Sequence, residues 1–275
     1  ADGATGTNLF ALGLQTGDSP ELWNADQPDR VKQHYRSFVD AGSDIILTNT
    51  FGGTTRRLML HGGEQRVREL NRRAAELAHE VVAETRAESG RDVVVAGSMG
   101  PTGDIFQPLG SLAYADGVNA FAEQARGLAE GGVDLLWIET ISSVDELKAA
   151  VEGASVAGLP VATTLSFDTN GRTMMGVTPD QLSTLVQTLT PKPMAYGANC
   201  GVGASELIVA LKNMGEVAAS RDVLIAKSNC GIPEWSGDRI VYSGTPELMA
   251  DYTRLAIDCG ARIVGGCCGT TPEHI

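Results

Sequence analysis

Cysteine is the residue type that first suggests chemistry in this chain. There are five cysteines, an odd number, and all lie in the last third of the sequence. Such a set does not form the paired framework of a small disulfide-rich secreted protein, so it indicates a reducing, cytoplasmic compartment with thiols free for chemistry. The cysteines are Cys200, Cys230, Cys259, Cys267 and Cys268.

Cys200, Cys267 and Cys268 have the residue type expected of a metal site. Three thiolates suit Zn²⁺, which binds sulfur and nitrogen tetrahedrally and keeps its fourth position open in catalytic sites. Neighbours on a strand point to opposite faces, so both members of the adjacent pair can reach one ion only if the chain turns there. Gly266 before the pair and Gly269 after it permit that turn. The alternative interpretation is three small buried hydrophobic residues.

The remaining candidate ligands are assigned differently. Cys259 ends an apolar helical stripe and is predicted to pack in the core. Cys230 follows a predicted strand but is interpreted as a bystander thiol, one that takes no part in the chemistry. No function is assigned to the neighbouring Asn229. None of the four histidines lies at the end of a predicted strand, so no histidine is proposed as a ligand.

The elements that must position these residues alternate along the chain. Seven apolar, β-branched runs lack the alternation of a half-exposed strand, which is typical of parallel strands covered on both faces. Seven segments between them carry apolar residues at spacings of three and four, which predicts helices. The expected strands are 44–48, 93–97, 134–139, 161–167, 195–200, 223–228 and 261–267, and the expected helices are 28–41, 64–88, 115–131, 143–157, 179–189, 204–214 and 245–259.

These elements predict a single α/β domain. A first strand ending at Asp2 and an eighth helix beginning within Thr270–Ile275 bring the pattern to eight β/α units. That number favours a (β/α)₈ barrel of the TIM type, covering residues 1–275, over an open doubly wound sheet. Catalytic groups gather at the C-terminal ends of barrel strands, so the residues that end the strands form the candidate site.

The strand ends, read in order, resemble the homocysteine S-methyltransferase family over essentially the whole chain. This family includes betaine–homocysteine methyltransferases, S-methylmethionine-dependent enzymes and the homocysteine module of cobalamin-dependent methionine synthase. The GGCCGTTP run with an upstream NC is the most specific part. The matching segments are 2–7 (DGATGT), 47–52 (LTNTFG), 100–103 (GPTG), 139–140 (ET), 199–200 (NC) and 265–272 (GGCCGTTP).

The resemblance implies zinc-dependent transfer of a methyl group to the thiol of homocysteine, which gives methionine. It implies that Cys200, Cys267 and Cys268 bind the zinc ion, and metal coordination deprotonates a thiol near neutral pH. By the same resemblance the substrate residues are Asp2 and Glu139, whose carboxylates hold the amino group of homocysteine, and Gly3, Thr48 and Phe51, which line its pocket.

The methyl donor is expected to be a small onium ion, with glycine betaine first and S-methylmethionine or dimethylsulfoniopropionate as alternatives. An onium head group favours aromatic faces, and Trp23 is expected to supply one such wall. Betaine-using relatives carry tyrosines where this chain has Gly52 and Thr140, which argues against a tyrosine-lined cage. The other aromatic residues considered for the donor are Tyr114, Trp235 and Tyr242.

Two other classes of function stay open, namely a module of a larger corrinoid- or folate-dependent methionine synthase and a redox barrel whose cysteines sense oxidation.

The formal net charge of −13 disfavours nucleic acid and anionic membranes as partners, which leaves small-molecule substrates. No apolar run approaches the roughly 20 residues that span a bilayer. Both ends of the chain are expected to be trimmed, and a homo-oligomer is compatible with the sequence.

Overall fold

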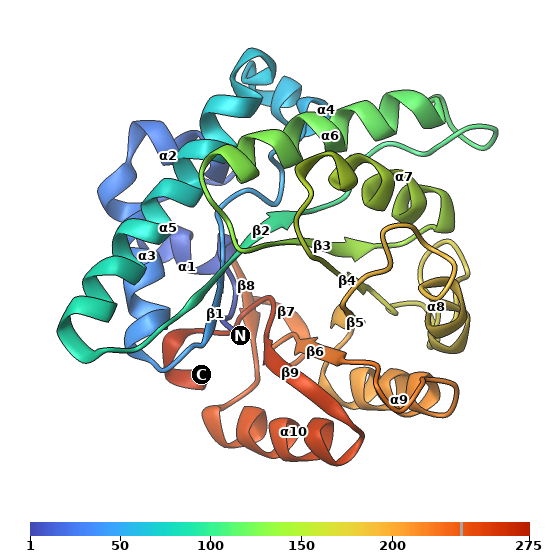
Figure 1. Cartoon of the computed structure of the whole chain (residues 1–275). Helices are drawn as coiled ribbons and strands as arrows, with labels where there is room; N and C mark the ends of the chain where they lie inside the picture. Colours follow the sequence, from blue (N-terminus) through green and yellow to red (C-terminus); the bar gives the residue numbers. More distant parts are fainter. Residues whose placement is uncertain (237–238) are drawn as a thin grey trace.

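The fold is built around one curved parallel sheet, in a computed structural model that describes residues 1–236 and 239–275. Seven strands pair in the order β1-β2-β3-β4-β5-β6-β9, and every pairing in this sheet is parallel. Figure 1 shows the strands curling around a common centre with the helices outside them. The strands are β1 (Ile45–Leu47), β2 (Val94–Met99), β3 (Leu135–Ile141), β4 (Val161–Leu165), β5 (Ala195–Cys200), β6 (Leu224–Ser228) and β9 (Ala261–Gly266).

Long helices connect successive strands and cover the outer face of the sheet (Figure 1). Several begin at side-chain caps, such as Thr178, which forms a capping box with Gln181. The helix after Thr178 stops at Leu185 and is shorter than the predicted 179–189. The long helices are α3 (Pro28–Asp40), α5 (Val67–Ser89), α6 (Tyr114–Glu130), α7 (Val144–Ala154), α8 (Pro179–Leu185), α9 (Ala204–Gly215) and α10 (Pro246–Asp258).

Shorter helices fill several of the connections between the main elements. They include single turns of 3₁₀ helix, which are common at helix ends and in connectors. These elements are α1 (Gly6–Ala11), η1 (Pro20–Leu22), α2 (Trp23–Asp26), α4 (Thr55–Leu58), η2 (Met59–His61), η3 (Glu64–Arg66), η4 (Ser155–Ala157) and η5 (Pro272–His274).

The inside of the curved sheet is filled by a separate layer of side chains. One buried residue from each of β1 to β6 joins this layer, and the only large ring in it belongs to Trp137, which is fully buried. Small residues face it across the register, since Trp137 pairs with Ala162 and Ala162 pairs with Ala195. Layers of this kind make the interior of such a sheet a packed core. The layer consists of Leu47, Ala96, Trp137, Ala162, Ala195 and Ile225.

The first and eighth β/α units differ from the prediction. Asp2 lies between the sheet edges, because its N–H donates to the Ile45 carbonyl (2.9 Å) and its carbonyl accepts the Gly266 N–H (3.0 Å). This two-sided contact involves too few residues to form a strand. In place of an eighth helix the structure has only the 3₁₀ turn η5. The structure therefore shows a curled seven-stranded sheet, and the prediction of eight strands is confirmed only in part.

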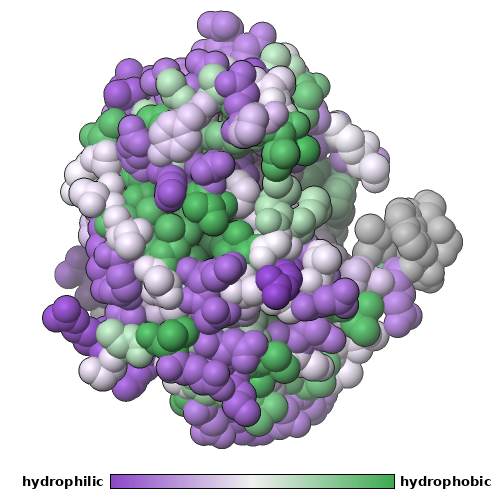
Figure 2. Space-filling model, turned by 90° about the vertical axis from the view of Figure 1, so that its right-hand side faces the viewer, coloured by the Kyte–Doolittle hydropathy of each residue, from purple (hydrophilic) through white to green (hydrophobic). Residues whose placement is uncertain are grey.

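An antiparallel hairpin between β6 and α10 was not predicted. Its strands are β7 (Pro233–Ser236) and β8 (Arg239–Tyr242), which pair with each other and form a sheet of their own. Figure 2 shows the side of the molecule that carries α8 and α9, where hydrophobic groups of different sizes lie among hydrophilic residues. Within the described residues, no helix is both long enough and apolar enough to cross a bilayer.

Candidate active site

The structure brings the thiols of Cys200, Cys267 and Cys268 together. Their Sγ atoms all lie within 4.8 Å of one another. Cys200 is the last residue of β5, and the other two follow β9 directly, so the cluster sits at the C-terminal ends of parallel strands. Zinc–sulfur bonds of about 2.3 Å in tetrahedral geometry place sulfurs about 3.8 Å apart. The three thiols therefore fit a zinc ion.

A tight turn allows both members of the cysteine pair to face the cluster. The Cys267 N–H donates to the Ser228 carbonyl (2.7 Å), so this residue still belongs to the sheet. The Thr270 N–H then donates back to the Cys267 carbonyl (3.1 Å), which closes the turn around Cys268. Gly269 in this turn has a φ of 78°, a left-handed value that glycine adopts without strain. The turn removes the strand alternation that would separate the two thiols.

Asn229 joins the two strand ends that carry the thiols. Cys200 has a φ of 60° at the end of β5. The Asn229 Nδ2 donates to the Gly201 carbonyl (2.7 Å), and its Oδ1 accepts the Cys268 N–H (3.0 Å). Because its side chain is buried, these bonds hold one orientation of each strand end. The sequence placed Asn229 at a strand end but contained no signal for contacts with residues so distant along the chain.

Electrostatics at the cluster favour a bound cation. The hydrogen bond with Cys200, together with burial, raises the pKa of the Cys267 thiol. For Cys268, the hydrogen bond with Cys200 lowers the pKa, but the contact with Cys267 and burial raise it to about 12. Three thiols this close do not all ionise unless a cation compensates their charge. A divalent cation such as zinc would supply that compensation.

The other two cysteines lie outside the cluster. Cys230 is 1% exposed and belongs to the main hydrophobic core. Cys259 follows the end of α10 and packs against the same core. All five cysteines are free thiols. These positions agree with the core role predicted for Cys259 and the bystander role predicted for Cys230.

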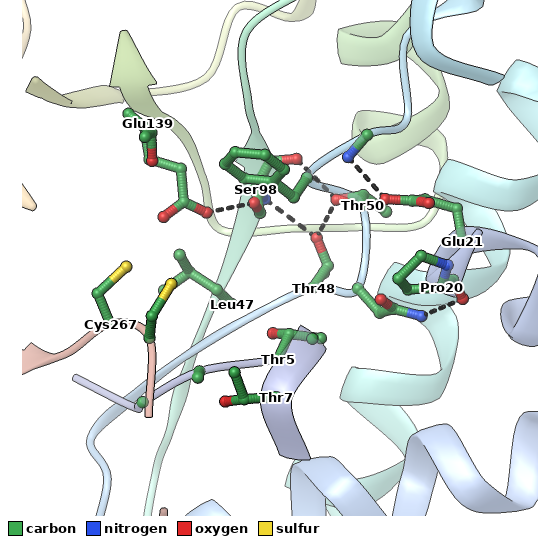
Figure 3. A pocket seen from close by; sticks show the side chains of 18 of the residues that line it. Thr5, Thr7, Pro20, Glu21, Leu47, Thr48, Thr50, Ser98, Glu139 and Cys267 are labelled. Atoms are coloured by element: carbon green, nitrogen blue, oxygen red, sulfur yellow. Dashed lines mark hydrogen bonds between the residues drawn. The ribbon is translucent and has the colours of Figure 1, made fainter. Parts of the chain in front are cut away.

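The three thiols line a cavity of about 400 Å³. In Figure 3, Cys267 and Glu139 lie toward one end, Thr48 and Thr50 lie in the middle, and Glu21 lies toward the other end. The volume is within the usual range for small-molecule sites. Four residues predicted to contact the substrate line this cavity, namely Gly3, Thr48, Phe51 and Glu139.

A chain of hydrogen bonds orders the polar wall of the cavity (Figure 3). The Ser98 hydroxyl donates to Glu139 Oε1, and the Ser98 N–H donates to Thr48 Oγ1 (3.0 Å). The Thr48 and Thr50 hydroxyls share a hydrogen bond (2.6 Å), and Thr50 Oγ1 donates to the Ser98 carbonyl (2.7 Å). Burial raises the pKa of Glu139, while nearby Lys227 and Ser98 act in the opposite direction. The wall thus holds a carboxylate in a fixed orientation.

Lys227 is a buried cation of the site that the sequence analysis missed. Its Nζ donates to Asp2 Oδ1 (2.8 Å), and both side chains are only 2% exposed. Asp2 Oδ2 accepts the Leu47 N–H (2.6 Å). Lys227 lines the cavity, whereas Asp2 is absent from its wall. The available signal was a lysine inside an apolar strand, because lysine is almost never fully buried unless it is paired.

Trp23 does not reach the cavity wall. It lies in α2 with 9% of its side chain exposed, and the Arg30 guanidinium lies 5.1 Å from its ring centroid. The Trp23 ring was expected to face the donor, but it packs against α3 instead. The aromatic side chains that do line the cavity are those of Phe10 and Phe51, which are 49% and 37% exposed.

Tyr114 and Tyr242, the other described aromatic candidates for the donor, do not line the cavity either. Tyr114 donates from its hydroxyl to Glu152 (2.9 Å) and does not line the cavity. Tyr242 packs against Gly269, where an added Cβ would lie 2.3 Å from its ring, and its hydroxyl lies beside the Cys268 thiol. The side chain of Trp235 lies outside the described part of the structure.

A second carboxylate lies at the end of the cavity away from the thiols (Figure 3). Glu21 Oε1 accepts the Gly52 N–H (2.6 Å), and its Oε2 accepts the Ser19 hydroxyl (2.6 Å). Both carboxylate oxygens therefore have partners within the protein. Glu21 thereby ties the loop after β1 to the N-terminal part of the chain.

Comparisons with known proteins point to one family. The profile of the family described as homocysteine S-methyltransferase matches residues 1–275. Methionine synthase of Mycobacterium tuberculosis is 32% identical over 287 residues, which cover 100% of this chain and 24% of that protein. The chain thus spans about a quarter of this relative.

Two solved structures share the fold. The metallated form of the homocysteine methyltransferase MmuM from Escherichia coli has a TM-score of 0.83 and 22% identity, over 99% of this chain and 92% of that chain. Its oxidized form has a TM-score of 0.80 and 24% identity over the same fractions. At sequence identities this low, the similarity to these structures is evidence for the fold alone.

Proposed function

The chain belongs to the homocysteine S-methyltransferase family, and we propose that it transfers a methyl group from a small onium donor, glycine betaine first, to the thiol of homocysteine. Family membership makes it a methyltransferase. The observation that carries the proposal is the convergence of Cys200, Cys267 and Cys268 on a cavity whose wall also contains the Glu139 carboxylate. One end of that cavity suits a metal-bound thiol, and the carboxylate suits an amino group.

The metal proposed for the cluster is zinc, held by the three cysteine thiolates. The ligand set is borderline soft and supplies three of the four bonds of a tetrahedral catalytic site. When bound, the ion keeps a substrate thiol in its thiolate form near neutral pH. Asn229 and the turn at Gly269 hold the cysteine side chains in place for that ion.

The amino-acid substrate is proposed to lie along the wall from the thiols to Phe51. Its sulfur lies at the cysteine cluster, and its charged end lies among Gly3, Thr48 and Glu139, which line the same cavity. The resemblance also implies Asp2, directly before Gly3, as a carboxylate of this region, although Lys227 already pairs with it. The hydrogen bonds from Ser98 to Glu139 and Thr48 fix the orientation of that wall.

The transfer itself is a single displacement. A lone pair of the homocysteine sulfur attacks the methyl carbon in line, the S–CH₃ bond forms, and the C–N bond of the quaternary ammonium breaks. Its electron pair stays on nitrogen, so dimethylglycine leaves as a neutral amine that needs no proton. The thiol proton has already passed to solvent. Because the leaving amine needs no proton, the step requires no general acid.

The donor is proposed to bind beside the rings of Phe10 and Phe51, because an onium head group is attracted to aromatic faces. Trp23, the residue first expected there, is taken up by α3. A donor panel tests this assignment. Glycine betaine, dimethylsulfoniopropionate, S-methylmethionine and methylfolate would each be supplied with homocysteine, and methionine would be measured. Turnover with methylfolate alone would reject the onium donor.

A methionine synthase module is the second candidate function. It is favoured by the 32% identity with methionine synthase and by the small share of that relative which the chain covers. In this case the methyl group arrives on a carrier held by another part of the protein. Methionine formed from a methylated corrinoid, with none from free onium donors, would support it.

The finer points of architecture and setting are also proposals. We propose that residues 1–275 form one (β/α)₈ domain, with Ala1 and Asp2 in the position of the first strand between β1 and β9. The free thiols suit a cytoplasmic setting. The proposed partners are small molecules and not nucleic acid or membranes. Self-association is compatible with this proposal, and a measurement of the mass in solution tests it.

A further inference from the structure

The two carboxylates near the amino-acid site have different surroundings, and this difference points to a division of roles. We propose that Lys227 neutralises Asp2 and withdraws it from substrate recognition, so that Glu139 alone receives the ammonium group of the amino-acid substrate. Lys227 then acts as a positioning residue rather than a catalytic one. This inference rests on the proposed function and assigns the charges of the same site.

Both carboxylate oxygens of Asp2 already have partners within the protein. Its Oδ1 pairs with Lys227 Nζ at 2.8 Å, and its Oδ2 accepts the Leu47 N–H at 2.6 Å. The carboxylate is 2% exposed and does not line the cavity. A substrate ammonium could reach Asp2 only by displacing a buried lysine. That exchange would leave the lysine charge buried without a partner, which is strongly unfavourable.

Glu139 has the opposite arrangement. Its Oε1 accepts the Ser98 hydroxyl, and among the described residues no hydrogen bond involves its Oε2. The side chain lines the cavity and remains 8% exposed. A carboxylate oxygen that is open to the cavity and has no protein partner can accept a charge-assisted hydrogen bond from an ammonium group. Glu139 is therefore prepared for a cation in a way that Asp2 is not.

Lys227 completes the charge balance. Its Nζ lies 5.4 Å from the centroid of the Trp137 ring, in the packed layer inside the sheet, and this contact limits its movement. The pair of Asp2 and Lys227 is neutral as a unit. Lys227 also acts on Glu139 through its charge, but among the described residues no hydrogen bond joins the two, so Glu139 Oε2 remains open to the positive charge of the amino-acid substrate. The other basic residues of the described wall are Arg57 and His61, from α4 and η2.

The test compares homocysteine with 4-mercaptobutanoate, the same molecule without its amino group. Binding of each to the zinc-loaded protein is measured by calorimetry, and the ratio of dissociation constants reports recognition of the ammonium group. We expect the wild type to prefer homocysteine by about 10- to 100-fold, as for a charged hydrogen bond. Glu139→Gln should bring the ratio close to one, whereas Asp2→Asn should keep it near the wild-type value.

Lys227→Met should increase the preference for homocysteine over 4-mercaptobutanoate, which a purely structural role of Lys227 would not do. Without the lysine, Asp2 becomes available, so the preference for homocysteine should increase several-fold, and Asp2→Asn in the same protein should remove that increase. Glu146→Gln is the matched control. Its buried carboxylate accepts the Thr102 N–H (2.8 Å) and hydroxyl (2.7 Å) outside the cavity wall, so the ratio should stay unchanged.

The outcomes separate this inference from the proposed function. Absence of homocysteine binding to the zinc-loaded wild type would reject the proposed function itself. Binding with a ratio near one in Asp2→Asn would overturn the inference and return Asp2 to the amino group. If Asp2→Asn does not fold, the Lys227→Met ratio decides, because a preference equal to or below that of the wild type contradicts the withdrawal of Asp2.

Discussion

At the scale of single residues, the site is made of buried groups whose charges each need a partner. Buried charges persist in proteins only when paired or bound to a metal. The thiol cluster fits a divalent cation, and Asp2 is paired with Lys227. Glu139 keeps one oxygen for a cationic ligand. Removing a single partner at any of these places should therefore have a large and specific effect.

Cys200→Ala tests the metal centre. Two remaining thiols are too few for a stable zinc site of this type, so the variant should lose the metal that the reduced wild type holds at about one ion per chain. Elemental analysis of freshly reduced protein measures this. Cys259→Ala, whose thiol packs against the core, serves as the control and should retain its zinc. Equal zinc content in all three proteins would exclude the cysteine cluster as the metal site.

The burial of His34 leads to a prediction of how the free energy of unfolding depends on pH. Burial lowers the pKa of this histidine from 6.5 to about 4, and its Nδ1 has no hydrogen-bond partner. The unfolded chain therefore binds the proton more readily, so the contribution to stability is present above pH 6.5 and is lost as the pH falls toward 4. The full loss is about 3 kcal/mol.

Urea unfolding at pH 7 and pH 4.5 checks this prediction. His34→Gln should have a smaller difference in unfolding free energy between the two pH values than the wild type. His61→Gln is the control, because His61 is exposed, and it should retain the wild-type difference. A pH dependence that is the same with and without His34 would contradict the buried neutral imidazole.

At the scale of elements, two buried side-chain amides donate hydrogen bonds to the loop between β1 and α4 and hold it in place. Gln124 Nε2 from α6 donates to the Thr50 carbonyl (2.7 Å), and Asn71 Nδ2 from α5 donates to the Gly53 carbonyl (2.8 Å). The helices behind the sheet thereby set the position of Thr48 and Phe51 in the cavity wall. This is the part of the site where packing of elements, rather than side-chain chemistry, decides geometry.

Gly53→Ala is the matching experiment. An added Cβ would lie 2.5 Å from Asn71 Oδ1 and 2.8 Å from Gln124 Nε2, so one of the two amides must move. We expect a loss of about 1–3 kcal/mol in unfolding free energy and weaker binding of homocysteine. At Gly215 the nearest atom would be 3.7 Å away, so Gly215→Ala should be neutral or slightly stabilising. Similar melting temperatures for both variants would argue against the amide support.

At the scale of the whole molecule, the metal site exists only in the folded chain. Its ligands come from the ends of β5 and β9, which are separated in the sheet by β6. The unfolded chain cannot present the three thiols in one geometry, so a metal bound to the native state stabilises the whole fold.

Removal of zinc should lower the melting temperature. At a free zinc concentration about 100 times the dissociation constant, the stabilisation is about 2.7 kcal/mol, or roughly 5–10 °C for a domain of this size. Thermal unfolding with and without a chelator measures the effect. The variant with alanine at all three cysteines should show no difference between the two conditions. The prediction fails if that variant responds to the chelator as strongly as the wild type.

Local pattern was sufficient for much of this protein. The predicted strand 195–200 coincides with β5, and the predicted helix 204–214 differs by one residue from α9. Hydrophobic periodicity depends on neighbours in the chain, so it is legible without a structure. The strand ends also marked Cys200, Cys267 and Glu139 as members of one site, because parallel strands bring their C-terminal ends to the same edge.

Only the tertiary structure decided which of these residues act together. Lys227 and Asp2 are 225 residues apart, and although a lysine in an apolar strand indicates that it has a partner, the sequence does not identify that partner as Asp2. Packing against α3 took Trp23 away from the cavity, and β7 and β8 formed a hairpin where no strand was expected. Local sequence records which side chains are available at each strand end, whereas the energy of burying a charge depends on the partner that the fold places beside it.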